Sequence, residues 1–271
     1  MLGTMNFDLQ KWRNDAEKKR QQSEEAVKIN PEGVTGYRDL GWALYNLGRY
    51  REAEEPLRQA IGLNPGDYYT HYHLGLVLAE LHRLDESETE LLRSIQLQPN
   101  NADAHRSLGV VWYEQHRFED AVLAYQEAIR LKPDYACAYF CLGATYWELS
   151  EQAKAIAAYR EALRLNPRYV PAAANLGWLY FDRGEFAQSA ELIAQAIENA
   201  PMWEANTPGQ QTDFPRLYTK LGEALAKSGN VESALKQYRV LRRFDRIAAG
   251  KLLQAIRGKG AVKWPNRTRS R

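Results

Sequence analysis

The 271-residue sequence lacks the features that most secreted and membrane proteins need. It has only two cysteines, too few for a disulfide framework, so we expect a reducing compartment. No stretch approaches the ~20 consecutive apolar residues of a membrane span. The N-terminal residues also lack the charged and then apolar pattern of a secretory signal. These absences predict a cytoplasmic protein.

Groups typical of catalysis are equally scarce. The sequence has five histidines and no converging catalytic constellation, no phosphate-cradling loop and no dinucleotide fingerprint. His71 and His105 fall at positions that hold packing aromatics elsewhere in the chain, and His82 and His116 fall at expected turns. We therefore predict no catalytic residue, no cofactor and no enzymatic activity.

The two cysteines, Cys137 and Cys141, are four residues apart and share one face of an expected helix. Such a pair could bind a soft metal or act in redox chemistry. No histidine or third cysteine is in register to complete a site. We favour two small groove residues beside Phe140 and predict no metal site.

Neither sign of charge dominates, since the formal net charge is +2, but the charge is unevenly distributed. Residues 246–271 contain eight basic and no acidic side chains, which leaves about −6 for residues 1–245. Such a tail could contact nucleic acid or an anionic membrane. It could equally be inert.

What the sequence does have is a repeat of 34 residues. Prolines recur at this spacing at Pro31, Pro65, Pro99, Pro133, Pro167 and Pro201. Leu-Gly pairs recur with the same period, starting at Leu40, Leu74, Leu108, Leu142 and Leu176. Each unit is expected to form two amphipathic helices of about 14 residues. Glycine lets their axes approach closely, and the proline ends the second helix.

The units resemble the tetratricopeptide repeat. The fourth is the clearest, with the family's residues at Tyr139, Leu142, Gly143, Tyr146, Ala155, Tyr159, Ala162 and Pro167. The resemblance covers roughly residues 14–244 and implies an all-α, right-handed α-solenoid of stacked helix-turn-helix repeats. It says little about function, because this fold serves many partners.

The departures from the repeat predict the domain organisation. We expect a polar N-terminal helix, which is a degenerate repeat or a cap, over 1–33; five full repeats over 34–203; an inserted loop over 204–214; a sixth repeat with a C-terminal capping helix over 215–257; and a basic, disordered tail over 258–271.

In this family the first helix of each repeat lines a concave groove. The resemblance therefore implies these peptide-binding residues: Arg38, Trp42, Tyr45, Tyr69, Tyr72, Glu80, Arg106, Tyr113, Glu114, Phe140, Trp147, Glu148, Asn175, Trp178, Phe181 and Asp182. Aromatic clusters favour protein contacts, although some of these rings could instead pack between helices. Acids that recur every 34 residues favour a basic ligand, although they could be solvated surface charges.

We therefore expect a non-catalytic scaffold that binds a partner peptide with apolar and basic residues. One alternative is a targeting or adaptor module for an enzyme or assembly complex acting in trans. Others are nucleic-acid or membrane association through the tail, and self-association in which the tail or N-terminal helix of one molecule occupies another's groove.

Overall fold

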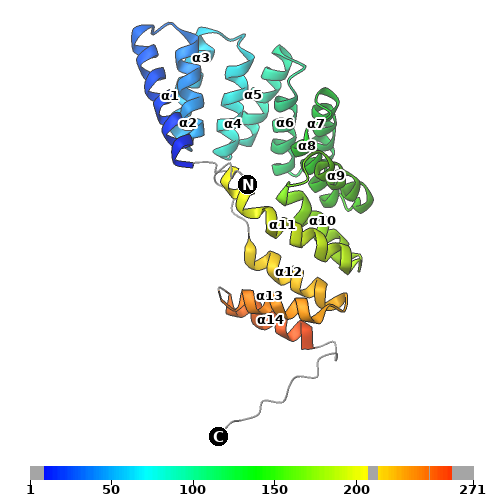
Figure 1. The fold of residues 1–271 in the computed structure, drawn as a ribbon. Coiled ribbons are helices and arrows are strands. Elements are labelled where there is room, and N and C mark those ends of the chain that lie inside the picture. Colours follow the sequence, from blue (N-terminus) through cyan, green and yellow to red (C-terminus); the bar gives the residue numbers. More distant parts are fainter. Residues whose placement is uncertain (1–8, 207–212, 244, 258–271) are drawn as a thin grey trace. The chain divides into compact units, whose positions relative to one another are not determined.

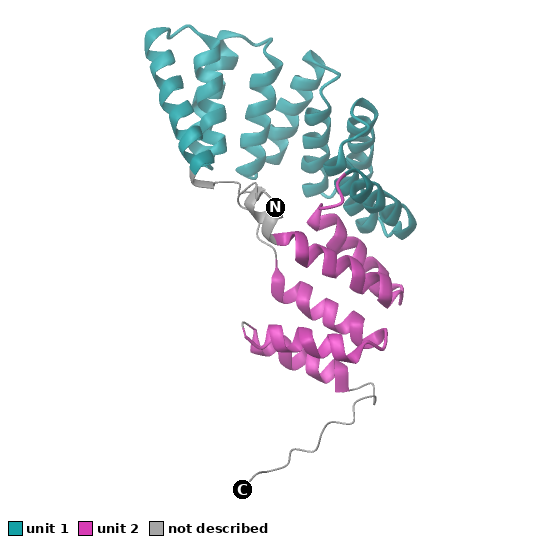
Figure 2. Cartoon of the chain, viewed as in Figure 1, with its two compact units in different colours: residues 1–165 teal, residues 166–271 magenta. Residues whose placement is uncertain are grey.

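The computed structural model describes residues 9–206, 213–243 and 245–257. These residues form fourteen α-helices and no strand (Figure 1). The chain divides into two compact units, one ending at Leu165 and the other beginning at Asn166 (Figure 2). The expected all-α fold is confirmed.

Unit 1 is a single helix followed by four helical hairpins. The helices are α1 (Leu9–Ile29), α2 (Val34–Asn46), α3 (Tyr50–Leu63), α4 (Tyr68–Glu80), α5 (Leu84–Leu97), α6 (Ala102–Glu114), α7 (Phe118–Leu131), α8 (Ala136–Glu148) and α9 (Gln152–Leu165). Each first helix packs on its own second helix, and each of α2, α4 and α6 also contacts the first helix of the next hairpin. Stacking buries apolar faces that a lone hairpin would expose.

The repeated glycines lie where the two helices of a hairpin touch. A Cβ atom on Gly75 would lie 2.7 Å from Leu91, one on Gly109 would lie 2.6 Å from Tyr125, and one on Gly143 would lie 2.8 Å from Tyr159. These distances are shorter than any real van der Waals contact. Glycine is therefore required for the close packing, as the spacing predicts.

The repeated prolines mark helix ends in unit 1. Helices α3, α5, α7 and α9 each end two residues before a proline, at Leu63, Leu97, Leu131 and Leu165. The missing N–H and the bulk of the proline ring disfavour continuation of the helix.

The turns inside the hairpins need a left-handed residue. Glycine supplies it at Gly48, with φ of 72°. His82, His116 and Ser150 adopt φ of 57°, 60° and 60° at the corresponding places, although non-glycine residues rarely do so. The interpretation of His82 and His116 as turn residues is confirmed.

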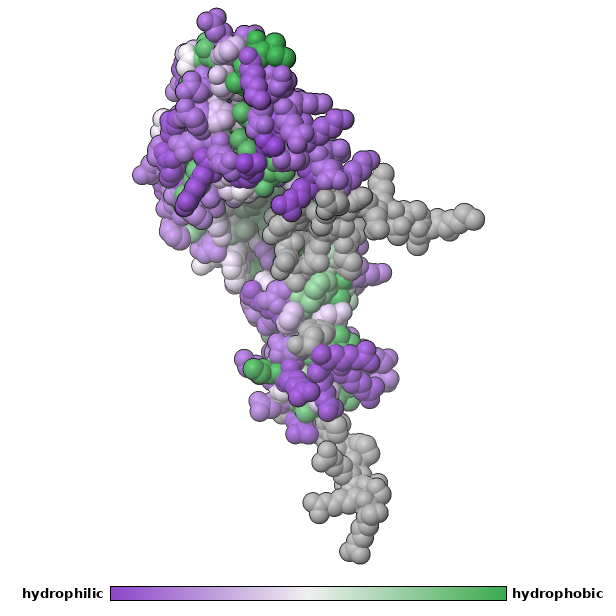
Figure 3. All heavy atoms as spheres, turned by 90° about the vertical axis from the view of Figure 1, so that its left-hand side faces the viewer, coloured by the Kyte–Doolittle hydropathy of each residue, from purple (hydrophilic) through white to green (hydrophobic). Residues whose placement is uncertain are grey.

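Helix α1 lies at one end of unit 1 and packs on α2. The Lys19 ammonium and Asp39 carboxylate are 2.9 Å apart and link the two helices. Figure 3 looks onto this side of unit 1, where the surface is largely hydrophilic, with hydrophobic side chains confined to narrow strips. A polar outer face is what a terminal cap of a repeat stack requires.

Unit 2 contains two hairpins and a final helix. Its helices are α10 (Val170–Asp182), α11 (Phe186–Asn206), α12 (Phe214–Lys227), α13 (Val231–Leu241) and α14 (Arg246–Arg257). Helix α14 contacts both α12 and α13 and buries Ala249, Leu252 and Ile256 almost completely. A Cβ on Gly222 would lie 2.4 Å from Leu252, so α14 supplies the close contact at this glycine.

One helix end differs from the prediction. Helix α11 continues through Pro201 to Asn206, so the expectation that each repeated proline stops a helix is wrong there. After Pro31, Pro65 and Pro99 a turn or helix-capping sequence such as Gly66-Asp67 follows, whereas Met202-Trp203-Glu204-Ala205 favours a helix. The first three residues of the expected 204–214 insertion are therefore helical. Residues 207–212 of the insertion and the 258–271 tail lie outside the described residues.

Candidate protein-binding site

In unit 1 the first helices α2, α4, α6 and α8 are neighbours in space. Their shared surface is termed the first-helix face. The four helices carry twelve of the sixteen residues predicted to line a groove: Arg38, Trp42, Tyr45, Tyr69, Tyr72, Glu80, Arg106, Tyr113, Glu114, Phe140, Trp147 and Glu148. The other four, Asn175, Trp178, Phe181 and Asp182, belong to α10 in unit 2.

Aromatic rings on α2 and α4 form one continuous stack. The Trp42 ring lies 5.1 Å from the Tyr45 ring and 4.4 Å from His73, nearly parallel to both. The His73 ring in turn lies 5.6 Å from Tyr72 and 6.3 Å from Tyr69. The rings support one another across the two helices, so part of the predicted aromatic surface is also packing.

Two of the predicted aromatics remain open to solvent. Tyr69 is 47% exposed and Trp147 is 40% exposed, which is unusual for side chains of this size. The Arg38 guanidinium pairs with Asp67 at 3.1 Å and lies over the Tyr69 ring at 6.0 Å. Exposed Tyr and Trp with a nearby Arg are typical of contact surfaces.

His73 is neutral within this stack. Burial, and then the positive charge of Arg38, lower the pKa of His73 to about 4. Its Nδ1 atom is buried and has no hydrogen-bond partner among the described residues. The histidine therefore acts as a flat aromatic surface near neutral pH and adds no charge to the face.

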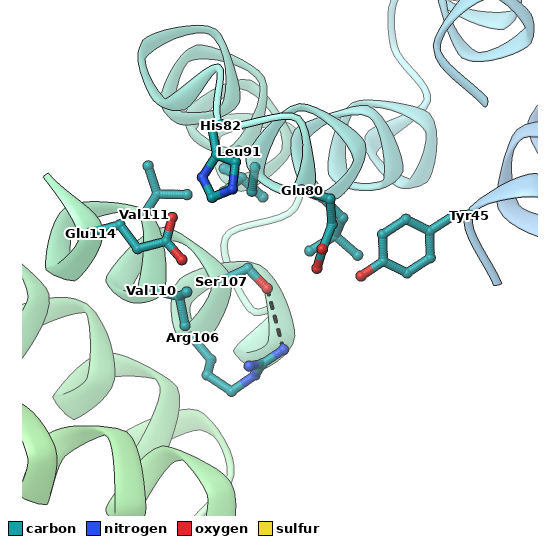
Figure 4. Close-up of a pocket in the computed structure, with 11 residues that line it drawn as sticks. Tyr45, Glu80, His82, Leu91, Arg106, Ser107, Val110, Val111 and Glu114 are labelled. Carbon is teal, nitrogen blue, oxygen red and sulfur yellow. Dashed lines mark hydrogen bonds between the residues drawn. The ribbon is translucent and has the colours of Figure 1, made fainter. Parts of the chain in front are cut away.

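A pocket of about 190 Å³ opens between α4 and α6 (Figure 4). Apolar side chains line part of it: Leu76, Ala79, Leu91, Val110 and Val111. Polar groups around them come from three helices and a turn: Tyr45, Glu80, His82, Arg106, Ser107 and Glu114. An apolar lining with carboxylates beside it suits a long side chain with a positive end.

The acids recur at the same place in successive hairpins. Glu80, Glu114 and Glu148 are the last residues of α4, α6 and α8, and all three are exposed. Burial and then the Glu80 charge raise the pKa of Tyr45 to about 12. Burial and Glu148, which accepts a hydrogen bond from the Tyr113 hydroxyl at 3.3 Å, raise the pKa of Tyr113. The acids thus impose a negative potential on the neighbouring phenols.

Arg106 supplies the one guanidinium group among the residues that line this pocket. Its Nη2 donates to Ser107 Oγ at 3.5 Å, and its Cζ lies 5.9 Å from the Tyr135 ring centroid. Its Nε is buried with no hydrogen-bond partner in the described part of the chain.

In unit 2 the predicted residues have different neighbours. Phe181 is only 8% exposed, and the ammonium groups of Lys220 and Lys227 lie 3.9 and 4.2 Å from its ring centroid. The Arg216 guanidinium covers Trp178, with Cζ 4.0 Å from the ring centroid. These rings lie beneath cations and are not an open aromatic surface.

Sequence reasoning did not single out Arg216. The available signal was its place four residues before Lys220, which puts both charges on one face of α12. The stacking on Trp178 could not be read from the repeat, because the chain between α10 and α12 departs from the period.

Reactive groups do not gather in the described residues. The pKa of Cys141 is raised by a hydrogen bond with Cys137 and by burial, which favours the thiol over the reactive thiolate. No group of three or more His, Cys, Asp or Glu side chains is arranged to hold a metal ion there. None of the described helices combines the length and apolar character of a membrane span.

The repeated hairpins define an α-helical repeat protein, and comparison with known families agrees. Profiles of the tetratricopeptide repeat match residues 38–102 and 150–205, and a further profile of the same repeat matches residues 111–150. The chain is a tetratricopeptide repeat protein. Among curated proteins, no sequence matches it.

Solved structures share this fold. The match to PilF of Pseudomonas aeruginosa covers 87% of this chain and 98% of the PilF chain, at 20% identity and a TM-score of 0.68. PilW, a type IV pilus biogenesis factor, matches 81% with 98% of its own, at 13% identity and a TM-score of 0.67. YrrB matches 69% with 96% of its own, at 18% identity and a TM-score of 0.54.

These likenesses establish the fold and leave the partner open. Tetratricopeptide repeats are in general non-catalytic modules that bind other proteins, and the chain is built as such a protein–protein interaction scaffold. The particular residues of the first-helix face remain predicted contacts.

Proposed function

We propose that the first-helix face of unit 1 binds an extended or helical segment of a partner protein with apolar and basic residues. The proposal rests mainly on the combination of exposed aromatic rings and exposed carboxylates on the four first helices. Tyr69 and Trp147 supply the rings, and Glu80, Glu114 and Glu148 supply the charge. The remaining expectations, a cytoplasmic location, an adaptor role in trans and contacts made by the tail, stay predictions.

The apolar part of the segment would contact the rings. Tyr and Trp contribute disproportionately to protein interfaces, because each buries a large rigid surface at a small entropic cost. The Trp42–His73 stack lies beside Tyr69 and holds this part of the surface in place before the partner arrives. A preformed surface reduces the ordering cost to that of the peptide.

The basic part of the segment would reach the pocket between α4 and α6. There the alkyl portion of a Lys or Arg side chain fits over Val110 and Val111, and the charged end meets Glu80 or Glu114 (Figure 4). Flexible peptides lose entropy on binding, so we expect affinities that are roughly micromolar. YrrB, which shares the fold, is described as having an unusual peptide-binding site, and this precedent agrees with the proposal.

The test is selection of peptides from a random library on the full chain, followed by affinity measurement on variants. Tyr69→Ala/Trp147→Ala should weaken the selected peptides at least tenfold, because both rings are exposed and can be truncated without a cavity. The matched control is Leu92→Ala/Leu123→Ala, since both leucines are exposed on second helices.

Circular dichroism must show that both double variants are folded. Selected peptides whose affinity falls in Tyr69→Ala/Trp147→Ala should be rich in Lys, Arg and aliphatic residues. Equal weakening by the two double variants, or a loss in Tyr69→Ala/Trp147→Ala confined to acidic peptides, would contradict the proposal.

A further inference from the structure

A second charged pocket lies within unit 2, between α12 and α14. Its volume is about 530 Å³, nearly three times that of the pocket in unit 1. Three basic and three acidic side chains line it: Arg216, Lys220, Lys251, Asp213, Glu223 and Asp245. Acidic and basic side chains are equal in number, but they differ in how many have a hydrogen-bond or ion-pair partner within the unit.

All three acids already have partners. Asp213 Oδ1 accepts a hydrogen bond from the backbone N–H of Arg216 at 3.0 Å, and Asp245 Oδ1 accepts one from Ala248 at 2.8 Å. Each therefore caps the first turn of its helix. Glu223 pairs with Lys220 at 3.5 Å. Two of the acids thus cap helix N-termini, and the third forms an ion pair with a lysine.

Two of the basic groups have no such compensation. Among the described residues of α12, α13 and α14, the ion pairs are Lys220 with Glu223 and Lys236 with Glu232. Arg216 and Lys251 have no carboxylate within 4.0 Å in that part of the chain. Arg216 is held over the Trp178 ring, which supplies no hydrogen-bond acceptor to the edge of the guanidinium.

The surroundings strengthen the positive potential. The ammonium groups of Lys220 and Lys227 both lie near the ring of Phe181. The indole Nε1 of Trp178, beneath Arg216, is a buried donor with no hydrogen-bond partner among the described residues. Cations that lack a carboxylate partner raise the local concentration of anionic ligands near them.

We propose that this pocket binds an acidic segment of a partner protein, with an Asp or Glu carboxylate between Arg216 and Lys251. Arg in particular can grip a carboxylate with two parallel N–H donors. The site differs in place and in sign from the face proposed for basic peptides, so neither proposal depends on the other.

A short acidic segment fits the lining better than a nucleic acid. Asp213, Glu223 and Asp245 would repel a continuous chain of phosphates, whereas one carboxylate can approach the two open cations. The chain's own C-terminal residues 246–271 have no acidic side chain, so this tail does not supply the segment.

The experiment measures fluorescence anisotropy of labelled peptides with the full chain in 150 mM salt. A peptide that repeats Glu-Gly should bind at least tenfold tighter than one that repeats Gln-Gly. Arg216→Glu/Lys251→Glu should lose this binding at least tenfold. Lys236→Glu/Arg239→Glu makes the same change of net charge on exposed α13 side chains and should alter it less than twofold.

Because Arg216 also covers Trp178, Lys251→Gln provides a variant that leaves the packing intact. Lys251 is exposed, and its loss should weaken the Glu-Gly peptide about threefold. Equal binding of the two peptides, or equal losses in the two double variants, would overturn the proposal. A labelled dT12 oligonucleotide could instead bind more tightly than the Glu-Gly peptide and lose this binding in Arg216→Glu/Lys251→Glu. That result would overturn the proposal and identify a nucleic acid as the ligand.

Discussion

At the residue scale, glycine has opposite effects on stability at two kinds of position. At the hairpin contact it is needed for close packing, whereas on an exposed helix surface it slightly destabilises the helix. An alanine Cβ at Gly143 would lie 2.8 Å from the Tyr159 ring, which is almost fully buried and cannot move away. Gly143→Ala should therefore lower the free energy of unfolding by about 1–3 kcal/mol. Urea unfolding followed by circular dichroism measures the change.

Gly62 provides the matched control for this substitution. It lies in α3, is exposed, and has no atom within 4 Å of an added Cβ. Gly62→Ala should raise stability by about 0.5 kcal/mol, because alanine restricts the unfolded chain and favours the helix. A loss of stability in both variants would show that contact with Tyr159 is not the cause.

His71 carries a pH dependence that follows from its partners. Its Nδ1 is 2.6 Å from Glu90 Oε2 and its Nε2 is 3.1 Å from the Pro65 carbonyl oxygen. Both partners are acceptors, so both nitrogens must donate, which requires the charged imidazolium. Burial opposes this charge, but the bonds to Glu90 and Pro65 prevail and raise the pKa of His71.

A raised folded-state pKa stabilises the fold at low pH. The stabilisation is complete below the unfolded pKa of about 6.5 and disappears as the pH rises through the folded pKa. The coupling between His71→Gln and Glu90→Gln in a double-mutant cycle should be on the order of 1–2 kcal/mol at pH 5.5 and smaller at pH 8.5. A coupling that grows with pH would contradict this account.

Single residues also show where sequence reasoning stops. The glycines and the turn histidines were predictable, because each repeats a backbone constraint every 34 residues. The cover of Phe181 by Lys220 and Lys227 was not, because those lysines follow an insertion and their reach depends on where α12 packs. Phe181 therefore stood among the predicted groove residues although it is buried.

At the scale of elements, α14 should act as the cap of unit 2. Leu252 and Ile256 are at most 1% exposed, and they cover α12 and α13. Deleting residues 246–271 should expose that surface and sharply reduce hydrogen-exchange protection across α12 and α13. Deleting only 258–271 should leave the protection unchanged, since α14 is kept.

Unit 1 provides an internal reference for this deletion. Its helices contact their own neighbours, so the amides of α2 to α8 should keep their protection in both truncated chains. Loss of protection throughout the chain would mean that stability is not local. No loss in α12 and α13 would mean that α14 is not a cap.

The ends of most second helices were predictable from the repeated prolines, and the exception has a reason. The second helices of unit 1 end before a proline, and at Pro65 and Pro99 turn or capping residues follow it, so local chemistry and period agree there. At Pro201 the period predicted an end, but helix-favouring residues follow, and α11 continues to Asn206. The end of a helix depends on several neighbouring residues, whereas the 34-residue period predicts only the position of the proline.

At the scale of the molecule, a net charge of +2 conceals two surfaces of opposite character. The pocket of unit 1 has exposed acids beside an apolar lining, and the pocket of unit 2 has two cations without carboxylate partners in the described residues. A family resemblance cannot predict such a difference, because the repeat fixes the packing positions and leaves the surface positions free. A scaffold with two unlike sites can select two unlike segments.

The two surfaces should therefore act independently, which a crossed comparison can test. A labelled peptide that repeats Lys-Leu-Gly should lose about tenfold in affinity with Glu80→Gln/Glu114→Gln and change less than twofold with Arg216→Glu/Lys251→Glu. The peptide that repeats Glu-Gly should show the reverse pattern. At 150 mM salt charges are screened beyond about 8 Å, so an effect of overall charge would be small and alike in both variants. If each variant instead weakens one peptide and strengthens the other equally, overall charge governs binding, and neither pocket is a separate site.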